Sequence, residues 1–137
     1  MTFTRVSYAV GRAGLASLFV LGAGNKLGSY EPTLQKMSEA GIQQPDLLLP
    51  AVILLELIGG LIVAFGVRGS WPSAIALAVF TLATNVMFHR FWMMEGVIAQ
   101  LELSLFFKNI AIASGLVLVA GIEYSRRLAL LGNVFSK

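Results

Sequence analysis

The chain has 137 residues, of which 57% are hydrophobic and only 12% are charged. Soluble domains carry about 25% charged residues on average, so this composition excludes an ordinary water-soluble domain. The chain contains no cysteine, which excludes a disulfide framework, a thiolate-bound iron–sulfur cluster and a thiol relay. Its single histidine excludes bis-histidine haem and multi-histidine zinc or di-iron sites. A net charge of +3 is too small for a nucleic-acid footprint.

Four apolar stretches are long enough to cross a bilayer, since a spanning helix needs about 20 predominantly apolar residues. They lie at about residues 6–27, 47–66, 71–88 and 105–122. Backbone groups of a single span find partners inside lipid only in a helix. We therefore predict an all-α, four-helix transmembrane bundle. The linkers are too short for a second domain, so residues 1–137 are expected to form a single integral membrane domain.

The longest polar connection, residues 28–46, is predicted to contain a short helix. Pro32 fits the first turn of a helix, apolar residues follow it at helical spacing, and Gly41 suits the position just after a helix end. Residues 31–40 are therefore expected to form an interfacial helix between the first and second spans.

The distribution of lysine and arginine predicts the topology. Five basic residues fall in the terminal segments and the second connection, against two in the other connections. The five are Arg5, Arg68, Arg126, Arg127 and Lys137, and the two are Lys36 and Arg90. Because basic residues are retained on the cytoplasmic side, both termini are expected to be cytoplasmic. The short helix and the connection at residues 89–104 then face the opposite side.

Two charged residues fall well inside the predicted spans, away from the span ends, and need partners. Glu56 lies at the middle of the second span, where an uncompensated carboxylate costs at least about 2.5 kcal/mol. Arg12 lies about 7 Å to the cytoplasmic side of the midpoint of the first span, within reach of its long side chain. We predict a buried Arg12–Glu56 ion pair, or failing that another polar partner for Glu56. The pair either handles protons or fixes helix register.

Further polar residues are expected at one depth on the non-cytoplasmic side. Asn85 and His89 share a face of the third span because they are four residues apart. Lys26 ends the first span, and Lys108 with Asn109 begins the fourth. At most one of Lys108 and Asn109 faces the bundle, because adjacent helical residues are 100° apart. With two aromatic walls, the candidate ligand pocket comprises Lys26, Asn85, His89, Trp92, Phe106, Lys108 and Asn109.

Three interpretations of this pocket remain open. A quinone head group needs one or two hydrogen-bond donors in an apolar, aromatic-lined slot, which His89 and Asn109 beside the aromatic residues provide. Met87, Met93 and Met94 add soft ligands for Cu(I), although their spacing matches no metal signature and we predict no metal site. In the third interpretation the lysines snorkel, the asparagines pack helices and no ligand binds.

Short motifs follow one another in a fixed order across nearly the whole chain. They are Arg12 with Phe19, Gly24 and Lys26, a loop with Gly41, Glu56-Leu-Ile-Gly-Gly60, Gly66-x-Arg68, Phe88-His89 with Trp92, and Phe107-Lys108-Asn109. This arrangement resembles the DoxX family of small bacterial inner-membrane proteins. The resemblance implies a four-helix bundle in the bacterial inner membrane and an association with redox metabolism. It supplies no established catalytic residues.

From the resemblance we expect a component of a redox-linked membrane complex that binds quinone or a lipid-like small molecule. Such a chain is an oxidoreductase subunit without a catalytic motif of its own. Its expected partners are the lipid bilayer and either a redox enzyme or a second copy in a homo-oligomer, and not nucleic acid. The alternatives are a noncatalytic membrane adaptor or assembly factor for a partner enzyme and, third, a small transporter.

Overall fold

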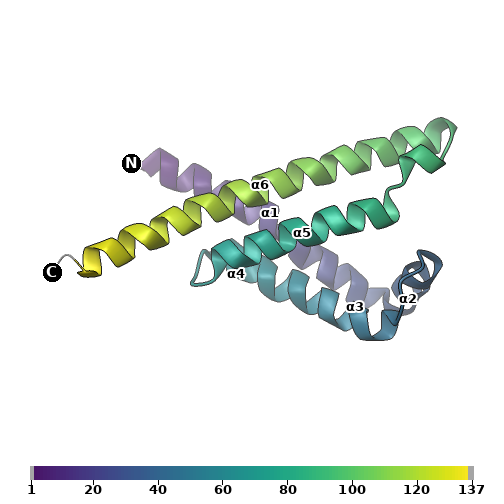
Figure 1. Cartoon of the computed structure of the whole chain (residues 1–137), viewed down its shortest axis with the longest axis horizontal. Coiled ribbons are helices and arrows are strands. Elements are labelled where there is room, and N and C mark those ends of the chain that lie inside the picture. The colour runs from purple at the N-terminus through teal and green to yellow at the C-terminus, as the bar shows by residue number, and fades with distance from the viewer. Residues whose placement is uncertain (1, 136–137) are drawn as a thin grey trace.

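The structure, a computed structural model, describes residues 2–135. Within this range it consists of helices and short connections, with no strand. Four helical segments are long and apolar enough to cross a membrane (Figure 1). They are Thr2–Gly28, Pro45–Phe65, Ser70–Met93 and Gly96–Gly132. The predicted all-α fold with four spans is therefore confirmed.

Three of the spans are regular α-helices over most of their length, and the second is interrupted. In chain order the elements are α1 (Thr2–Gly28), α2 (Tyr30–Glu39), α3 (Pro45–Leu54), the π-helical turn η1 (Leu55–Gly59), α4 (Gly60–Phe65), α5 (Ser70–Phe88), the 3₁₀ turn η2 (Phe91–Met93) and α6 (Gly96–Phe135). The second span thus consists of α3, η1 and α4. A single π-turn inside a helix is rare and is often found at functional sites.

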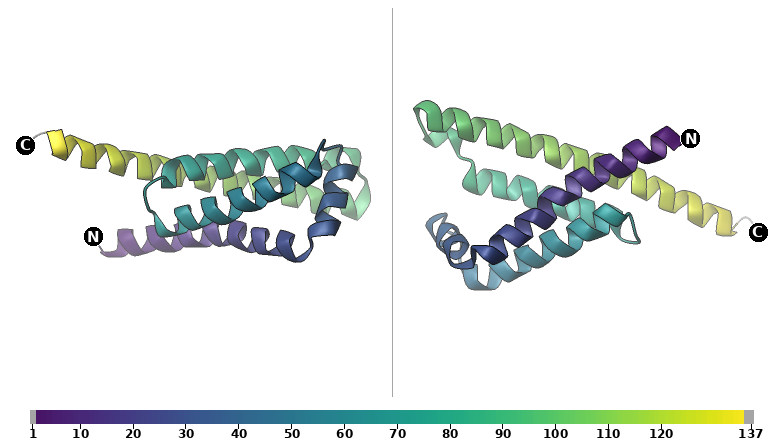
Figure 2. Two further views of the ribbon diagram at one scale, coloured as in Figure 1. Left: turned by 90° about the horizontal axis from the view of Figure 1, so that it is seen from below. Right: turned by 180° about the vertical axis from the view of Figure 1, so that it is seen from behind.

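The helices pack as two antiparallel pairs. α5 lies along α6, while α1 lies against α4 and η1 and also crosses α6 (Figure 2). The N-terminus, the C-terminus and the α4–α5 turn lie toward one end of the molecule, which we call the termini end. α2 and the connection between α5 and α6 lie at the other, which we call the α2 end.

The turn between α4 and α5 depends on two glycines. Gly66 ends α4 with φ of 63° and Gly69 precedes α5 with φ of 98°. Both values lie in the left-handed region, which glycine adopts without the steric cost of a Cβ atom. The chain therefore reverses within a few residues, and α5 packs back against α4.

The core at the centre of the bundle is rich in alanine. Its buried members are Ala16, Phe19, Val63, Ala74, Leu77, Ala78, Ala113, Leu116, Val119 and Ala120. Small residues allow helix backbones to approach closely, which is how helices associate in lipid. Gly60 of α4 lies close to the backbone of α1, since a Cβ atom at this position would be 3.4 Å from the backbone oxygen of Ala16.

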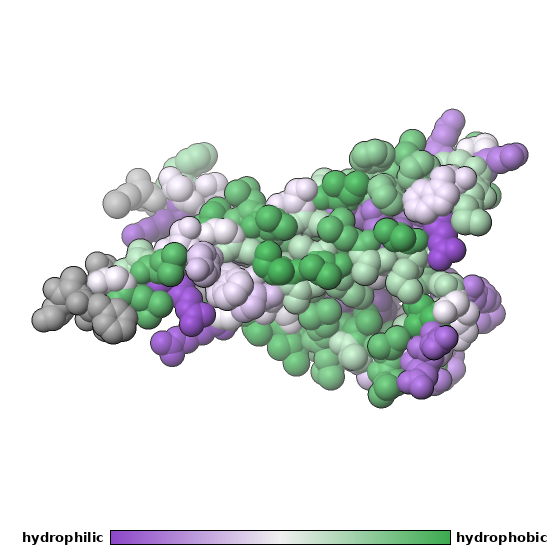
Figure 3. Space-filling model, in the orientation of Figure 1, coloured by the Kyte–Doolittle hydropathy of each residue, from purple (hydrophilic) through white to green (hydrophobic). Residues whose placement is uncertain are grey.

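Large apolar side chains cover much of the outer surface. Leu21, Val79 and Leu118 are more than 60% exposed. Figure 3 shows hydrophobic residues over the middle of the molecule and hydrophilic groups toward its two ends. A water-soluble monomer rarely exposes so large an apolar surface, whereas lipid solvates this surface well.

α2 forms close to the predicted boundaries. Its Met37 is buried with Ala23 of α1 and with Leu49 and Ile53 of α3. α2 therefore closes the gap between the first two spans at the α2 end. Its placement at a membrane interface stays a prediction.

α6 is much longer than the predicted fourth span of residues 105–122. It has 40 residues, which correspond to about 60 Å, twice the thickness of the hydrocarbon core. The charged residues that end the apolar run, beginning at Glu123, do not end the helix. Its C-terminal part consequently extends beyond the body of the bundle at the termini end (Figures 1 and 2).

Candidate functional site

Glu56 is buried inside the π-helical turn and is paired with Lys26 of α1. The Lys26 ammonium donates to both carboxylate oxygens, at 2.9 Å to Oε1 and 2.8 Å to Oε2. The side chains are 6% exposed for Glu56 and 27% exposed for Lys26. Gly22 of α1 lies next to the carboxylate, and a Cβ atom at this position would be 3.5 Å from Oε1. The carboxylate therefore lies beside the α1 backbone, with room for a small side chain at position 22.

The predicted Arg12–Glu56 pair is wrong because of the register between the first two spans. α1 runs antiparallel to the second span, and Gly22 lies beside Glu56. The same register places Arg12 beside Gly66, ten residues farther along the second span. Ten residues correspond to about 15 Å of helix, too far for the pair to form. Aligning the midpoints of the two apolar stretches misses this offset.

Arg12 instead joins a polar cluster at the termini end. It donates to Glu123 Oε1 of α6 at 3.2 Å. The Tyr8 hydroxyl and Arg126 donate to the same oxygen, at 2.8 Å and 3.2 Å. The Arg12 guanidinium also lies directly over Gly66, at the C-terminal end of α4. A cation is favourable there because the last carbonyls of a helix carry partial negative charge.

A second polar group links α5 to α6. The Asn85 amide donates to the backbone oxygen of Phe106 at 3.1 Å, and the Asn109 amide donates to Asn85 Oδ1 at 3.2 Å. Asn85 is fully buried, whereas Lys108 is exposed on another face of α6. Of the neighbouring pair, Asn109 is thus the residue that faces the bundle.

His89 lies at the end of α5 and contacts an acidic residue that the sequence prediction does not include. Its Nδ1 is 2.7 Å from Glu102 Oε2 on α6. A carboxylate at Nδ1 fixes the orientation of the ring and leaves Nε2 available to a further partner. The antiparallel register that pairs Asn85 with Phe106 could have identified Glu102, because it brings the start of α6 beside the end of α5.

Four aromatic rings gather beside His89. Phe91 lies against Trp92 and Phe106 with ring centroids 5.2 Å and 5.3 Å apart, and Trp92 and Phe106 are 6.0 Å apart. Phe107 extends the group from Phe106 at 5.8 Å. All four contacts are edge-to-face, the arrangement that aromatic quadrupoles favour. We call these four residues the aromatic cluster.

The structure divides the predicted pocket residues among three places. Asn85, His89, Trp92, Phe106 and Asn109 lie between α5, η2 and α6. Lys26 belongs to the separate pair with Glu56, and Lys108 points away. Among the described residues, no hydrogen bond or ion pair joins Lys26–Glu56 to the other group, and no three His, Asp or Glu side chains converge as metal ligands. Ligand binding stays a prediction.

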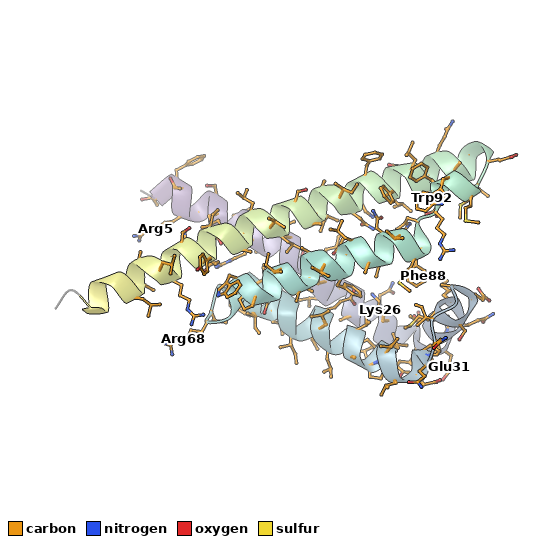
Figure 4. All side chains as sticks on the ribbon, in the orientation of Figure 1. Arg5, Lys26, Glu31, Arg68, Phe88 and Trp92 are labelled. Atoms are coloured by element: carbon orange, nitrogen blue, oxygen red, sulfur yellow. The ribbon has the colours of Figure 1, made fainter. Side chains whose placement is uncertain are left out.

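The side-chain view separates these groups clearly. Figure 4 shows Arg5 and Arg68 toward the termini end and Glu31, Phe88 and Trp92 toward the α2 end, with Lys26 between the helices. The His89–Glu102 pair and the aromatic cluster therefore occupy the end of the bundle opposite the Arg12–Glu123 cluster.

Comparisons with known proteins agree with the family resemblance. The sequence model of the DoxX family matches residues 7–90. Inner membrane protein YqjF of Escherichia coli K12 is 36% identical over 115 residues, which cover 84% of this chain and 82% of that protein. Inner membrane protein YphA of the same organism is 25% identical over 111 residues, which cover 81% and 79%. No solved structure matches the chain significantly.

Proposed function

The chain belongs to the DoxX family, and on this premise we propose that it serves a redox-linked membrane complex by binding a quinone, or a lipid-like molecule of similar shape, at the α2 end. The four apolar helices and the inner-membrane relatives make it a multi-pass inner-membrane protein. The proposal concerns what it binds there.

The observation that carries the proposal is the aromatic cluster beside the His89–Glu102 pair. A quinone head group is a flat, apolar ring with a carbonyl on each side, so it binds between aromatic walls and near hydrogen-bond donors. Trp92 and Phe107 are more than half exposed, which leaves aromatic surface accessible from the membrane. The isoprenoid tail of a quinone bound at the aromatic cluster can extend from this exposed surface into the lipid.

His89 supplies the polar contact in this proposal. Glu102 holds Nδ1, and Nε2 of a protonated imidazole donates to a quinone carbonyl. Asn109 adds a second polar side chain, held by Asn85. Reduction of a quinone to a quinol takes up two electrons and two protons. The partner enzyme supplies the electrons, and the His89–Glu102 pair is suited to passing protons.

The test is the quinone content of the full chain purified gently in native lipid. We expect isoprenoid quinone to be retained by the unaltered chain and lost by about tenfold or more in a His89→Ala, Asn109→Ala double variant. Lys108→Ala is the matched control, because Lys108 adjoins Asn109 but is exposed on another face. Equal retention by the double variant would remove quinone binding from the proposal.

A second measurement uses the intrinsic fluorescence of Trp92. A short-chain quinone added to the protein in nanodiscs should quench Trp92 in a Trp71→Phe background, because the chain has only two tryptophans. Quenching should saturate, and His89→Ala should weaken it. Stoichiometric co-purification of an enzyme without quinone would instead favour the adaptor function.

A further inference from the structure

A hollow of about 610 Å³ opens at the termini end between the α4–α5 turn and the C-terminal part of α6. Arg68, Arg126 and Arg127 line it beside the carboxylate of Glu123. We call it the arginine hollow. It is far from the aromatic cluster, at the opposite end of the bundle.

The charge of the arginine hollow is positive. Among its described lining residues the one carboxylate, on Glu123, accepts hydrogen bonds from Arg12 and Arg126. Arg126 is held further by the Tyr8 ring, whose centroid is 4.3 Å from the guanidinium carbon. Arg68 and Arg127 are exposed, and within the described residues neither forms an ion pair. Two arginine side chains are thus free to bind an anion.

The remaining walls of the arginine hollow are apolar. Val67, Leu130 and Leu131 are exposed, although each lines the hollow. Trp71 is fixed by an edge-to-face contact with Tyr124, with ring centroids 5.5 Å apart. A ligand that matches both the arginines and the apolar walls carries a negative charge next to an apolar group.

The position of the arginine hollow indicates the source of such an occupant. It lies at the α4–α5 turn, between the end of the second span at Phe65 and the start of the third at Ser70. A bilayer crossed by these spans therefore has its lipid head groups near the hollow. Figure 3 shows hydrophilic groups beside hydrophobic ones at this end of the molecule. Basic pockets between transmembrane helices are suited to lipid phosphates, and guanidinium groups bind phosphate in a bidentate manner.

We propose that the arginine hollow binds the phosphate head group of an anionic phospholipid. Arg68 and Arg127 contact the phosphate, and Val67 with the two leucines contacts the first carbons of the acyl chains. The bound lipid joins the α4–α5 turn to the extension of α6. This inference is independent of the quinone proposal, because the two sites share no residue.

Native mass spectrometry of the full chain tests the inference. Phosphatidylglycerol should bind more tightly than phosphatidylethanolamine, and an Arg68→Gln, Arg127→Gln variant should lose about 30-fold in affinity for phosphatidylglycerol. The control is Lys36→Gln, Lys108→Gln, which removes the same charge from exposed sites outside the hollow. A similar loss in both double variants, or in neither, would overturn the proposal.

Fluorescence provides a second readout that distinguishes a lipid from a free anion. In a Trp92→Phe background, Trp71 is the one remaining tryptophan. Brominated phosphatidylglycerol should quench it more than brominated phosphatidylcholine with the same chains, and the arginine double variant should abolish the difference. If millimolar inorganic phosphate removes the excess quenching, the hollow is a site for free anions and the lipid assignment fails.

Discussion

Three acidic side chains of the described residues are not exposed, and each is in contact with a basic side chain. Glu56 pairs with Lys26, Glu102 with His89, and Glu123 with Arg12. For Glu56, the need for a partner follows from the cost of placing a carboxylate in an apolar span. The identity of the partner does not follow from this cost, because it depends on the register and rotation of neighbouring helices.

Removal of Lys26 should destabilise the bundle more than neutralisation of Glu56. Lys26→Met leaves a buried carboxylate without its base, and we expect the free energy of unfolding to fall by about 1–3 kcal/mol, a range reduced because Lys26 is partly exposed. Glu56→Gln keeps a hydrogen-bond acceptor for Lys26 and should cost less. Chemical unfolding in mixed micelles measures both.

Lys108→Met is the control for the Lys26 prediction. It is the same substitution as Lys26→Met, but Lys108 is exposed. It should leave the free energy of unfolding nearly unchanged. A Lys26→Gln, Glu56→Gln double variant should recover part of the loss. If Lys26→Met and Lys108→Met behave alike, the Lys26–Glu56 pair contributes nothing to stability.

Gly66 should be intolerant of a side chain for two reasons. Its φ of 63° disfavours any residue with a Cβ atom. That atom would also displace the Arg12 guanidinium, which donates to Glu123. We expect Gly66→Ala to lower the free energy of unfolding by about 2 kcal/mol. Gly41→Ala separates the two causes, since Gly41 has φ of 80° but no neighbour within 4 Å. If Gly66→Ala and Gly41→Ala lower the thermal stability equally, the contact with Arg12 does not contribute to the effect at Gly66.

At the scale of elements, hydropathy predicts the spans well and their ends poorly. All four apolar stretches are helical, because lipid leaves the backbone no alternative. Hydropathy does not predict that α6 continues past Glu123, because a helix outside the membrane needs no continuous apolar run. The π-turn η1 also escapes it, because residues 55–59 have no composition that distinguishes a π-turn from an α-helix.

The partial success of the pocket prediction has a physical basis. Helical spacing places Asn85 and His89 on one face, and the structure keeps them beside α6. Spacing alone does not fix the rotation of α6, which decides that Asn109 faces inward and Lys108 outward. The depth of Lys26 in the membrane does not by itself determine its neighbour. Lys26 pairs with Glu56 of the second span and not with the other predicted pocket residues.

The contact between α5 and α6 should depend measurably on Asn85. Asn85→Leu removes its hydrogen bonds to Phe106 and Asn109, and hydrogen bonds between membrane helices contribute about 0.6–2 kcal/mol. We expect a loss of about 1 kcal/mol in the free energy of unfolding in micelles. Val86→Ala changes the neighbouring exposed residue and should have little effect. A neutral Asn85→Leu would show that packing alone holds the two helices together.

At the scale of the whole molecule, the two ends differ in charge. Arg5, Arg68, Arg126 and Arg127 lie toward the termini end, while Lys36 and Arg90 lie toward the α2 end. Lys137, which the topology argument also counts, lies outside the described residues. The structure therefore keeps the predicted grouping of these basic residues, and the orientation in the membrane stays a prediction.

The positive-inside rule leads us to expect the termini end in the cytoplasm. The chain has no cysteine, so single cysteines report accessibility without background. Ser38→Cys in α2 and Ser125→Cys in α6 occupy exposed positions at opposite ends. A membrane-impermeant maleimide that enters the periplasm should label Ser38→Cys in intact cells and Ser125→Cys only after the inner membrane is permeabilised, while the unaltered chain stays unlabelled.

The reverse pattern would place the aromatic cluster in the cytoplasmic half and the arginine hollow at the periplasmic face. The lipid and quinone experiments would be unaffected, because neither depends on orientation.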